Sequence, residues 1–512
     1  MNLAKIFSAE LEGIDARLIE VEVDINVGLH SFTIVGLGDK AVAEAKERVN
    51  AALKNSGVKP PNRENRKITV NLAPADVQKT GSQYDLAIAI GYLLATGQIK
   101  KFDATKKLFV GELSLDGTIR PVGGALNIAH LARELGFDAV FLPQANAHEA
   151  SLVSGITLIP TSTLQGLIGH LEDRDILPVF TKPASPEARI LPALDISEIK
   201  GQESAKRALM IAASGGHNVF MIGPPGSGKT MLAQSLVSIL PQPDLEEVIE
   251  ISKIYSAAGL FTKSFSYFAS RPFRTPHHTA SPVAVIGGGS NPRPGEISLS
   301  HRGVLFLDEL PEFRRDVLEA LRQPLESGTI TVSRARGTLT FPARFTLVAA
   351  MNPCPCGFFN DPEKECTCTA YEVFKYQKKV SGPLLDRIDI QITVPRIKVE
   401  VLRGTRETEE GDRLREQVLT ARMRQTERFA HAGKSIRTNS EMSSKQCDEF
   451  VNLSSGAETF LRERFDKLHL SPRAYYRILK TARTIADLEN APYVDVPHLA
   501  EAFQYRVKEI AS

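Results

Sequence analysis

The sequence contains little cysteine, little net charge and no long apolar run. Five cysteines in 512 residues are too few for the disulfide framework of a small secreted protein. The formal net charge is +2, so any binding to nucleic acid has to use a local basic patch. The most apolar stretch, Leu86–Ala95, is too short to span a bilayer, and Met1–Glu20 lacks the apolar core of a signal peptide. We therefore expect a cytoplasmic protein without a membrane partner.

What the sequence does contain is material for several domains. Its length exceeds what one hydrophobic core organises, and 42% apolar with 24% charged residues is ordinary for a globular chain. Residues 1–180 mix strand and helix patterns, and residues 181–194, rich in Pro, Ser and Ala, are typical of a linker. Residues 195–401 predict an α/β core, and residues 402–512 predict a helical C-terminal domain. The expected fold class is therefore multidomain α/β.

The expectation of a parallel sheet in residues 195–401 rests on short apolar runs that alternate with helical patterns. These runs are Asn218–Ile222, Val304–Leu307 and Phe345–Ala349. Residues 402–512 have few strand signals but several charged helical patterns, which predict a helical lid. These patterns are Asp412–Ala430, Glu458–Arg464 and Tyr475–Ala486.

A complete phosphate-binding motif follows the first of these apolar runs. The segment Gly223-Pro-Pro-Gly-Ser-Gly-Lys229-Thr230 matches G-x-x-x-x-G-K-[ST], and a helical pattern follows it. The glycines let the backbone wrap around phosphates, and the amides at the helix N-terminus supply positive potential. Lys229 would reach the β- and γ-phosphates of ATP, and Thr230 would hold Mg²⁺. The predicted nucleotide-binding residues are Gly223, Pro224, Pro225, Gly226, Ser227, Gly228, Lys229, Thr230 and, from a later strand, Asp308.

Two further predicted strands end in polar residues. Asp308 and Glu309 follow the second apolar run. After a complete P-loop they are typical of a Walker B motif, in which Asp308 binds Mg²⁺ and Glu309 is the general base that activates water. Alone, a pair of acids at a strand end could equally cap a helix or be solvated. Asn352 follows the third run and could position the attacking water or form the turn before Pro353.

Four further segments resemble a single known family. They are Arg271-Pro-Phe-Arg-Thr-Pro-His-His-Thr279, Pro294-Gly-Glu-Ile-Ser-Leu-Ser-His-Arg-Gly-Val-Leu-Phe-Leu-Asp-Glu309, Met351-Asn-Pro-Cys-Pro-Cys-Gly357 and Ser381-Gly-Pro-Leu-Leu-Asp-Arg-Ile-Asp389. With the P-loop, they resemble the magnesium-chelatase-like AAA+ ATPases, and more narrowly the ComM/YifB branch. The resemblance covers essentially the whole chain. It implies a hexameric ring motor, similar to helicases that drive branch migration of DNA during natural transformation.

The same resemblance implies roles for three residues. Asn352 would be sensor 1, Arg387 would be the arginine finger that points at the γ-phosphate of the neighbouring subunit, and Arg473 would be sensor 2. The residues around Arg387 give partial support, because a charge among apolar neighbours needs an anionic partner. An intramolecular salt bridge to Asp386 or Asp389 would satisfy that need equally well.

Residues 1–180 resemble the peptidase domain of Lon-type proteases. The segment that carries this resemblance is Gly111-Glu-Leu-Ser-Leu-Asp-Gly-Thr-Ile-Arg-Pro-Val-Gly-Gly124. These peptidases need a serine activated by a lysine. Here Gln83 falls on the serine position and Leu126 on the lysine position, and a shift of register to Ser82 would still leave no base. We expect a scaffold, or a module that binds a partner or DNA, without peptidase activity.

A predicted hairpin carries Arg334 and Arg336 in its turn. Alternating β-forming residues in Thr329–Ser333 and Thr338–Pro342 flank this turn. In this class of ATPase such a hairpin points into the pore of the ring, so its arginines could form a basic collar that contacts DNA phosphates. A solvated turn is the alternative. The pair His277-His278 could contact DNA or line the ATP interface, and metal binding is less favoured for it.

Four of the five cysteines are clustered. Cys354-x-Cys356 and Cys366-x-Cys368 make up an insert at residues 354–368 that could hold structural Zn²⁺ through four thiolates. The spacing is shorter than the usual C-x₂₋₄-C, so free thiols or a redox pair are the alternative. Cys447 stands alone and is expected only to pack.

Three functions compete at this point. The first is an ATP-driven motor that acts on single-stranded or branched DNA. The second is a chelatase-type motor that remodels a protein partner so that Mg²⁺ is inserted into a porphyrin. The third is a binding protein that uses ATP only as a switch, which the presence of Glu309 disfavours. The insert and the Lon-like region favour the first over the second by resemblance alone.

Overall fold

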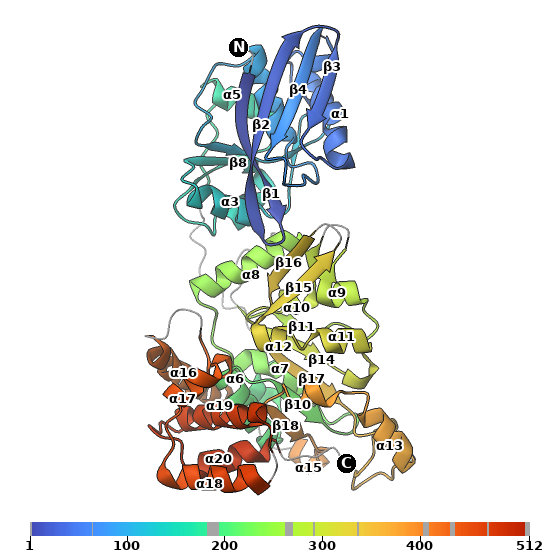
Figure 1. The fold of residues 1–512 in the computed structure, drawn as a ribbon, viewed down its shortest axis with the longest axis vertical. Coiled ribbons are helices and arrows are strands. Elements are labelled where there is room, and N and C mark those ends of the chain that lie inside the picture. Colours follow the sequence, from blue (N-terminus) through green and yellow to red (C-terminus); the bar gives the residue numbers. More distant parts are fainter. Residues whose placement is uncertain are drawn as a thin grey trace. The chain divides into compact units, whose positions relative to one another are not determined.

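The chain folds into two compact units (Figure 1). The computed structural model describes residues 3–63, 65–181, 194–261, 270–289, 292–334, 337–402, 409–430, 436–467 and 470–506. The first unit comprises Met1–Pro186 and Leu245–Phe268, and the second comprises Glu187–Asp244 and Ala269–Ser512. Both units contain a sheet covered by helices, and the second has a parallel core. The expected multidomain α/β class is therefore confirmed. The expected linker falls largely on residues 182–193, which lie outside the described part of the chain.

The first unit is built on a seven-stranded sheet in the order β3-β4-β2-β1-β5-β8-β9. The strands are β1 (Leu3–Glu12), β2 (Asp15–Val27), β3 (Ser31–Val35), β4 (Arg66–Ala73), β5 (Lys107–Phe109), β8 (Ala139–Pro143) and β9 (Thr157–Thr161). Buried Val21 and Val23 alternate with more exposed residues in β2, which is the pattern of a strand with one face on a core. The helices are α1 (Lys40–Asn55), α2 (Asp85–Thr96), α3 (Ala125–Glu134), α4 (Ala147–Ala150) and α5 (Leu164–Leu171), and the short strands β6 (Glu112–Leu113) and β7 (Ile119–Arg120) form a ribbon.

One helix of the first unit comes from the middle of the chain. Helix α8 (Leu245–Ala258) belongs by sequence to the segment after the P-loop, yet it packs on α3. The backbone N–H of Gly124 donates to the carbonyl oxygen of Ser256 at 3.1 Å, and the amide of Asn127 donates to the carbonyl oxygen of Lys253 at 3.2 Å. Periodicity alone does not show which sheet a helix covers, so the sequence did not reveal this packing.

The second unit is built on a five-stranded parallel sheet in the order β11-β14-β17-β10-β18. The strands are β10 (Val219–Ile222), β11 (Phe273–Arg274), β14 (Val304–Leu307), β17 (Thr346–Met351) and β18 (Ile390–Thr393), which include the three predicted apolar runs. Strand β17 is buried along its whole length, as expected for a sheet covered on both faces. Because the strands are parallel, the residues after β10, β14 and β17 meet at one edge.

Helices make up most of the remainder of the second unit. Those around the sheet are α6 (Glu203–Gly215), α7 (Lys229–Ile239), α9 (Pro282–Ile286), α10 (Glu296–Leu299), α11 (Arg315–Ala320), α12 (Pro324–Ser327), α13 (Ala370–Gln377), α14 (Gly382–Leu385) and α15 (Val399–Leu402). The C-terminal ones are α16 (Glu410–Phe429), α17 (Ser444–Phe450), α18 (Ser455–Lys467), α19 (Pro472–Leu488) and α20 (Val496–Gln504). The C-terminal helices share one hydrophobic core with β10 and α6. Among the described residues, no helix is both long and apolar enough to cross a membrane.

The predicted hairpin is present. Strands β15 (Thr329–Arg334) and β16 (Gly337–Pro342) pair antiparallel, with Ile330 opposite Phe341. Residue Arg336 and the side chain of Arg334 lie outside the described part of the chain.

Candidate active site

The P-loop connects β10 to α7, and its glycines are fixed by geometry. A Cβ atom on Gly223 would lie 2.2 Å from the carbonyl oxygen of Val394, so no side chain fits there. Gly226 and Gly228 have φ angles of +76° and +89°, which favour glycine. Helix α7 starts at Lys229, so its free N–H groups face the loop. The loop therefore has the shape and the partial charge that hold phosphates.

Lys229 occupies the position where a terminal phosphate would be bound. Its Nζ donates to the carbonyl oxygens of Gly223 at 2.7 Å and Pro224 at 2.9 Å, and to Oδ1 of Asn352 at 3.2 Å. Burial lowers the pKa of Lys229, and the charges of Asp308 and Glu309 act in the opposite direction. All three hydrogen-bond acceptors are neutral, so an anionic phosphate oxygen can replace them at a gain in electrostatic energy. The predicted sensor residue Asn352 lies beside the lysine.

Two oxygen ligands suited to Mg²⁺ lie next to the loop. The hydroxyl of Thr230, at the start of α7, donates to Oδ2 of Asp308 at 2.9 Å. Asp308 follows β14 and Thr230 follows β10, and these parallel strands, with β17 between them, bring the two side chains to the same edge of the sheet. Hydroxyl and carboxylate oxygens are the ligands that Mg²⁺ takes together with phosphate oxygens. The residues present thus fit an ATP–Mg²⁺ complex.

Glu309 adopts an unusual backbone conformation and faces a histidine. Its φ angle is +51°, a left-handed value that is uncommon for a residue other than glycine. Its Oε2 lies 3.5 Å from Nδ1 of His278, whose ring packs at 4.1 Å between centroids on His277. The histidine pair was expected either to contact DNA or to line the ATP interface. In the structure His278 lies beside Glu309, at the predicted ATP site. No sequence motif connects His278 with Glu309, so only the fold reveals the contact.

The predicted arginine finger, Arg387, and the predicted sensor 2, Arg473, both bind a third residue. Nη2 of Arg387 donates to Oε1 of Glu326 at 2.8 Å, and Nη2 of Arg473 donates to the same oxygen. In the described part of the chain Arg387 forms neither of the suggested salt bridges, since Asp389 pairs with Arg477 and Asp386 lies 3.9 Å from Arg506. Among the described residues, neither Arg387 nor Arg473 contacts the P-loop, Asp308 or Glu309.

The four clustered cysteines converge on one point. Their Sγ atoms all lie within 4.8 Å of one another, and those of Cys354, Cys356 and Cys366 are 3.3 to 3.7 Å apart. Tetrahedral Zn–S bonds of about 2.3 Å place sulfur atoms about 3.8 Å apart, so the cluster fits Zn²⁺. The backbone N–H of Gly357 donates to Sγ of Cys354 at 3.2 Å, as expected around a thiolate. Cys447 is buried elsewhere, as predicted.

The residues that align with the peptidase active site lie in a polar cluster around Glu10. The amide of Gln83 donates to Oε2 of Glu10 at 2.8 Å, and the hydroxyls of Thr80 and Tyr84 also donate to this carboxyl group. Burial raises the pKa of Glu10 to about 7, against the hydrogen bonds from Thr80. Ser82 instead donates to Glu112, and Leu126 is fully buried. The contacts described for Ser82 therefore include no lysine or histidine that could activate it.

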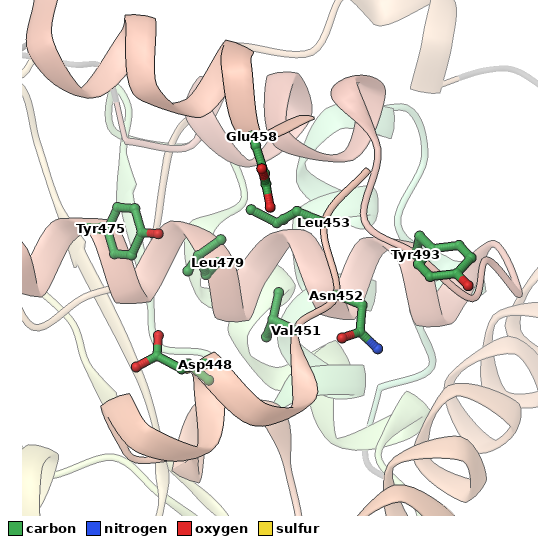
Figure 2. A pocket seen from close by; sticks show the side chains of 9 residues that line it. Asp448, Val451, Asn452, Leu453, Glu458, Tyr475, Leu479 and Tyr493 are labelled. Atoms are coloured by element: carbon green, nitrogen blue, oxygen red, sulfur yellow. The ribbon is translucent and has the colours of Figure 1, made fainter. Parts of the chain in front are cut away.

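A cavity of about 430 Å³ lies among the C-terminal helices. In Figure 2 the carboxylate of Asp448 from α17 points towards Tyr475 of α19, and Glu458 of α18 points towards Leu453. None of the residues predicted to bind ATP, zinc or DNA lines it.

The fold and the site define a class. The P-loop follows the inner strand β10 of a parallel sheet, the asparagine follows the neighbouring strand β17, and the acid pair follows β14 on the other side of β17. This arrangement makes the chain a P-loop ATPase of the AAA+ type. The family described as magnesium chelatase, subunit ChlI, matches residues 195–402. Two related families, subunit ChlI of Mg-chelatase and its C-terminal part, match residues 21–146 and 408–506.

Individual relatives define the family more narrowly. The chain is 44% identical over 510 residues to the competence protein ComM of Haemophilus influenzae, covering 99% of this chain and 98% of the relative. It is 41% identical over 507 residues to the YifB protein of Escherichia coli K12, covering 99% and 97%. The magnesium-chelatase 38 kDa subunit of Rhodobacter capsulatus is 26% identical over 190 residues, which is 34% of this chain and 54% of that protein. The chain belongs to the ComM/YifB family of magnesium-chelatase-like AAA+ ATPases.

Proposed function

We propose that this chain is the subunit of a hexameric ring that hydrolyses ATP to move single-stranded or branched DNA. Such a motor acts as a helicase or drives branch migration of recombination intermediates, as in natural transformation. The observation that carries the DNA part is full-length identity of 44% to a competence protein. This function places the ring in the cytoplasm, where ATP and DNA meet.

The ATP chemistry follows from the residues at the sheet edge. The P-loop amides and Lys229 would bind the phosphates, while Thr230 and Asp308 would hold Mg²⁺. Bound Mg²⁺ supplies charge that stabilises the transferred phosphoryl group. Glu309 would accept a proton from the attacking water at a carboxylate oxygen, and Asn352, beside Lys229, would hold that water in line.

The arginine pair supports an oligomer. Within one chain, Arg387 and Arg473 both donate hydrogen bonds to Glu326. Among the described residues, neither arginine contacts the P-loop of that chain. An arginine finger and a sensor 2 need a γ-phosphate, and a neighbouring subunit would provide it. Each active site would then lie between two chains, which links hydrolysis to assembly of the ring.

DNA contact is assigned to the β15–β16 hairpin. Six residue pairs hold the two strands of the hairpin together. Arg334 and Arg336 at its turn would bind phosphates around the pore, and their charge does not vary at neutral pH. Binding should therefore depend little on DNA sequence and weaken steeply with salt, with about 0.7–0.9 of log–log slope for each neutralised phosphate.

The decisive experiment measures ATPase activity with and without DNA for two proteins. The unmodified protein should be stimulated by single-stranded or branched DNA. The double variant Arg334→Ala, Arg336→Ala should retain basal ATPase and ring formation but lose both stimulation and strand movement. An unmodified ring that ignores single-stranded, duplex and branched DNA at low salt would contradict the DNA motor.

A chelatase-type motor that remodels a protein partner for Mg²⁺ insertion into a porphyrin is the second candidate. It is favoured by the 26% identity to the 38 kDa chelatase subunit over 190 residues. It predicts no response to DNA even for the unmodified protein, so the same assay separates the two functions. The cysteine cluster is assigned to structural Zn²⁺ under either function. Peptidase activity is assigned to neither.

A further inference from the structure

Glu326 belongs to no recognised motif, yet it binds both arginines that the proposed function assigns to a neighbouring subunit's phosphate. Its Oε1 is the acceptor for Nη2 of Arg387 at 2.8 Å and for Nη2 of Arg473. The side chain of Arg387 is 10% exposed, whereas those of Glu326 and Arg473 are 42% and 45% exposed. The cluster therefore has one buried member and two members that an incoming anion can reach.

The charges of this cluster are unbalanced. Two permanently charged guanidinium groups share one carboxylate, which leaves an excess of one positive charge. Arg387 also donates to the carbonyl oxygen of Pro383 at 2.6 Å, but its buried Nε has no acceptor among the described residues. A second anion is therefore attracted to the pair, and guanidinium geometry suits the oxygen atoms of a phosphate.

Glu326 is mechanically connected to the hairpin assigned to DNA. It lies on α12, and only Gly328 separates that helix from β15. The side-chain amide of Gln323 donates to Oγ1 of Thr331 at 2.9 Å, and its oxygen accepts from the backbone N–H of Thr331 at 3.3 Å. Because these bonds clamp the start of β15 to α12, a displacement of the hairpin also displaces the carboxylate.

We propose that Glu326 is an internal counter-anion that occupies Arg387 and Arg473 and competes for them with the phosphate of a neighbouring subunit's ATP. DNA that moves the hairpin withdraws the carboxylate and frees the two arginines. This inference rests on the proposed function, because the competing phosphate and the DNA-bound hairpin both come from it. Glu326 itself is a positioning residue, since it acts through the arginines and does not touch the substrate.

The first test compares Glu326→Gln with Glu326→Asp and with Glu319→Gln in ATPase assays. Glu319 lies on α11 and pairs with Arg322, so it is a matched carboxylate outside the cluster. Hydrogen bonds between partly exposed charged groups contribute only a modest free energy. Loss of the carboxylate in Glu326→Gln should therefore raise basal ATPase activity by about two- to tenfold. Its ratio of DNA-stimulated to basal rate should fall towards one. Glu326→Asp, which keeps the charge, and Glu319→Gln should keep a low basal rate.

The outcomes separate this inference from the proposed function. A Glu326→Gln protein whose basal rate is unchanged, or falls together with the stimulated rate, would overturn the counter-anion. An unmodified protein that hydrolyses ATP without responding to DNA would contradict the DNA motor, while the basal rates of the variants would still test Glu326.

A second measurement is independent of turnover. The rate at which phenylglyoxal modifies Arg387 and Arg473 is followed by peptide mass spectrometry in the intact, folded proteins. Loss of the carboxylate should speed modification of both residues by about two- to tenfold, because Glu326 then no longer competes with the reagent for the two guanidinium groups. Equal rates in Glu326→Gln and Glu319→Gln would overturn the proposal.

Discussion

The Glu10 cluster of the first unit and the P-loop site of the second are both built from buried polar groups, but they differ in how those groups are paired. The Glu10 carboxyl group receives donors from Thr80, Gln83 and Tyr84, all within its own unit. Lys229 contacts only neutral acceptors, which phosphate can replace. The Glu10 carboxyl group has its hydrogen-bond partners without a ligand, whereas the Lys229 ammonium group would gain a stronger partner from a bound phosphate. The two sites thus differ in whether their buried polar groups are already fully paired within the chain.

The largest expected effect is at Lys229. Lys229→Ala removes the only side-chain cation found in the described P-loop, so ATP binding and hydrolysis should both be lost. Equilibrium binding of a fluorescent ATP analogue measures this directly. The matched control is Glu10→Gln, which changes a buried charge-bearing group in the other cluster and should bind ATP normally. If Lys229→Ala still bound the ATP analogue, the P-loop site would not depend on this lysine, and the proposed difference from the Glu10 cluster would be wrong.

The next effect concerns Arg387. Arg387→Ala subunits should assemble but hydrolyse ATP about 10³–10⁵-fold more slowly, because arginine fingers contribute that much in related phosphoryl transfer. Mixing them with Lys229→Ala subunits should restore some activity, since a mixed interface can combine an intact P-loop with an intact arginine. No rescue at any ratio, with mixed rings verified by native mass spectrometry, would place the arginine in the same chain's site.

Glu309 sharpens the comparison by separating binding from chemistry. Glu309→Gln should bind ATP with unchanged affinity and hydrolyse it about 10²–10⁴-fold more slowly, because only acceptance of the proton from water is lost. Single-turnover hydrolysis with excess protein measures that step. Hydrolysis comparable to that of the unmodified protein would remove Glu309 from its proposed role.

The cysteine cluster should behave like the P-loop rather than like Glu10, in that it needs a ligand. Elemental analysis should find about one zinc per chain for four thiolate ligands, and Cys354→Ser, Cys366→Ser should lose it and unfold at a lower temperature. Cys447→Ser is the control that should keep the metal. Protein purified under reducing conditions that is folded, active and free of metal would contradict this site.

The smallest effect on ATPase activity is expected from Glu10, where the consequence is pH-dependent stability. Its pKa is raised by burial from 4.5 to about 7, so the unfolded chain ionises first as the pH rises. The contribution of Glu10 to stability is therefore largest below pH 4.5 and falls by about 3 kcal/mol by pH 7. Glu10→Gln should flatten this dependence in urea unfolding at the two ends of the range. Burial also raises the pKa of Asp85 to about 6 and that of Glu149 to about 7. Part of the dependence of the free energy of unfolding on pH should therefore remain in the Glu10→Gln variant.

Short apolar runs in the sequence predicted the parallel sheet of the second unit, but they did not reveal contacts between residues far apart in the chain. The P-loop, the acid pair and Asn352 each follow an apolar run, and parallel pairing then brings their side chains to one edge. Glu326 contacts residues 61 and 147 positions away, and no periodicity or spacing encodes such pairs. The docking of α8 on α3 was hidden for the same reason. The sequence placed Gln83 and Leu126 at the positions of the peptidase serine and lysine, but it did not reveal that Gln83 binds Glu10, which lies 73 positions upstream.

Helix α8 also determines how this protein can be taken apart. The chain leaves the first unit before the P-loop and re-enters it at Leu245, so the first unit is discontinuous in sequence. A specific protease site introduced between the described residues 181 and 194 should, once cut, leave two fragments that co-purify, because α8 stays packed on α3. A truncated chain ending at Pro186 would expose the face of α3 and leave the N–H of Gly124 without its acceptor. Attempts to study the first unit in isolation therefore need residues 245–268 restored, for example by grafting them after Pro186.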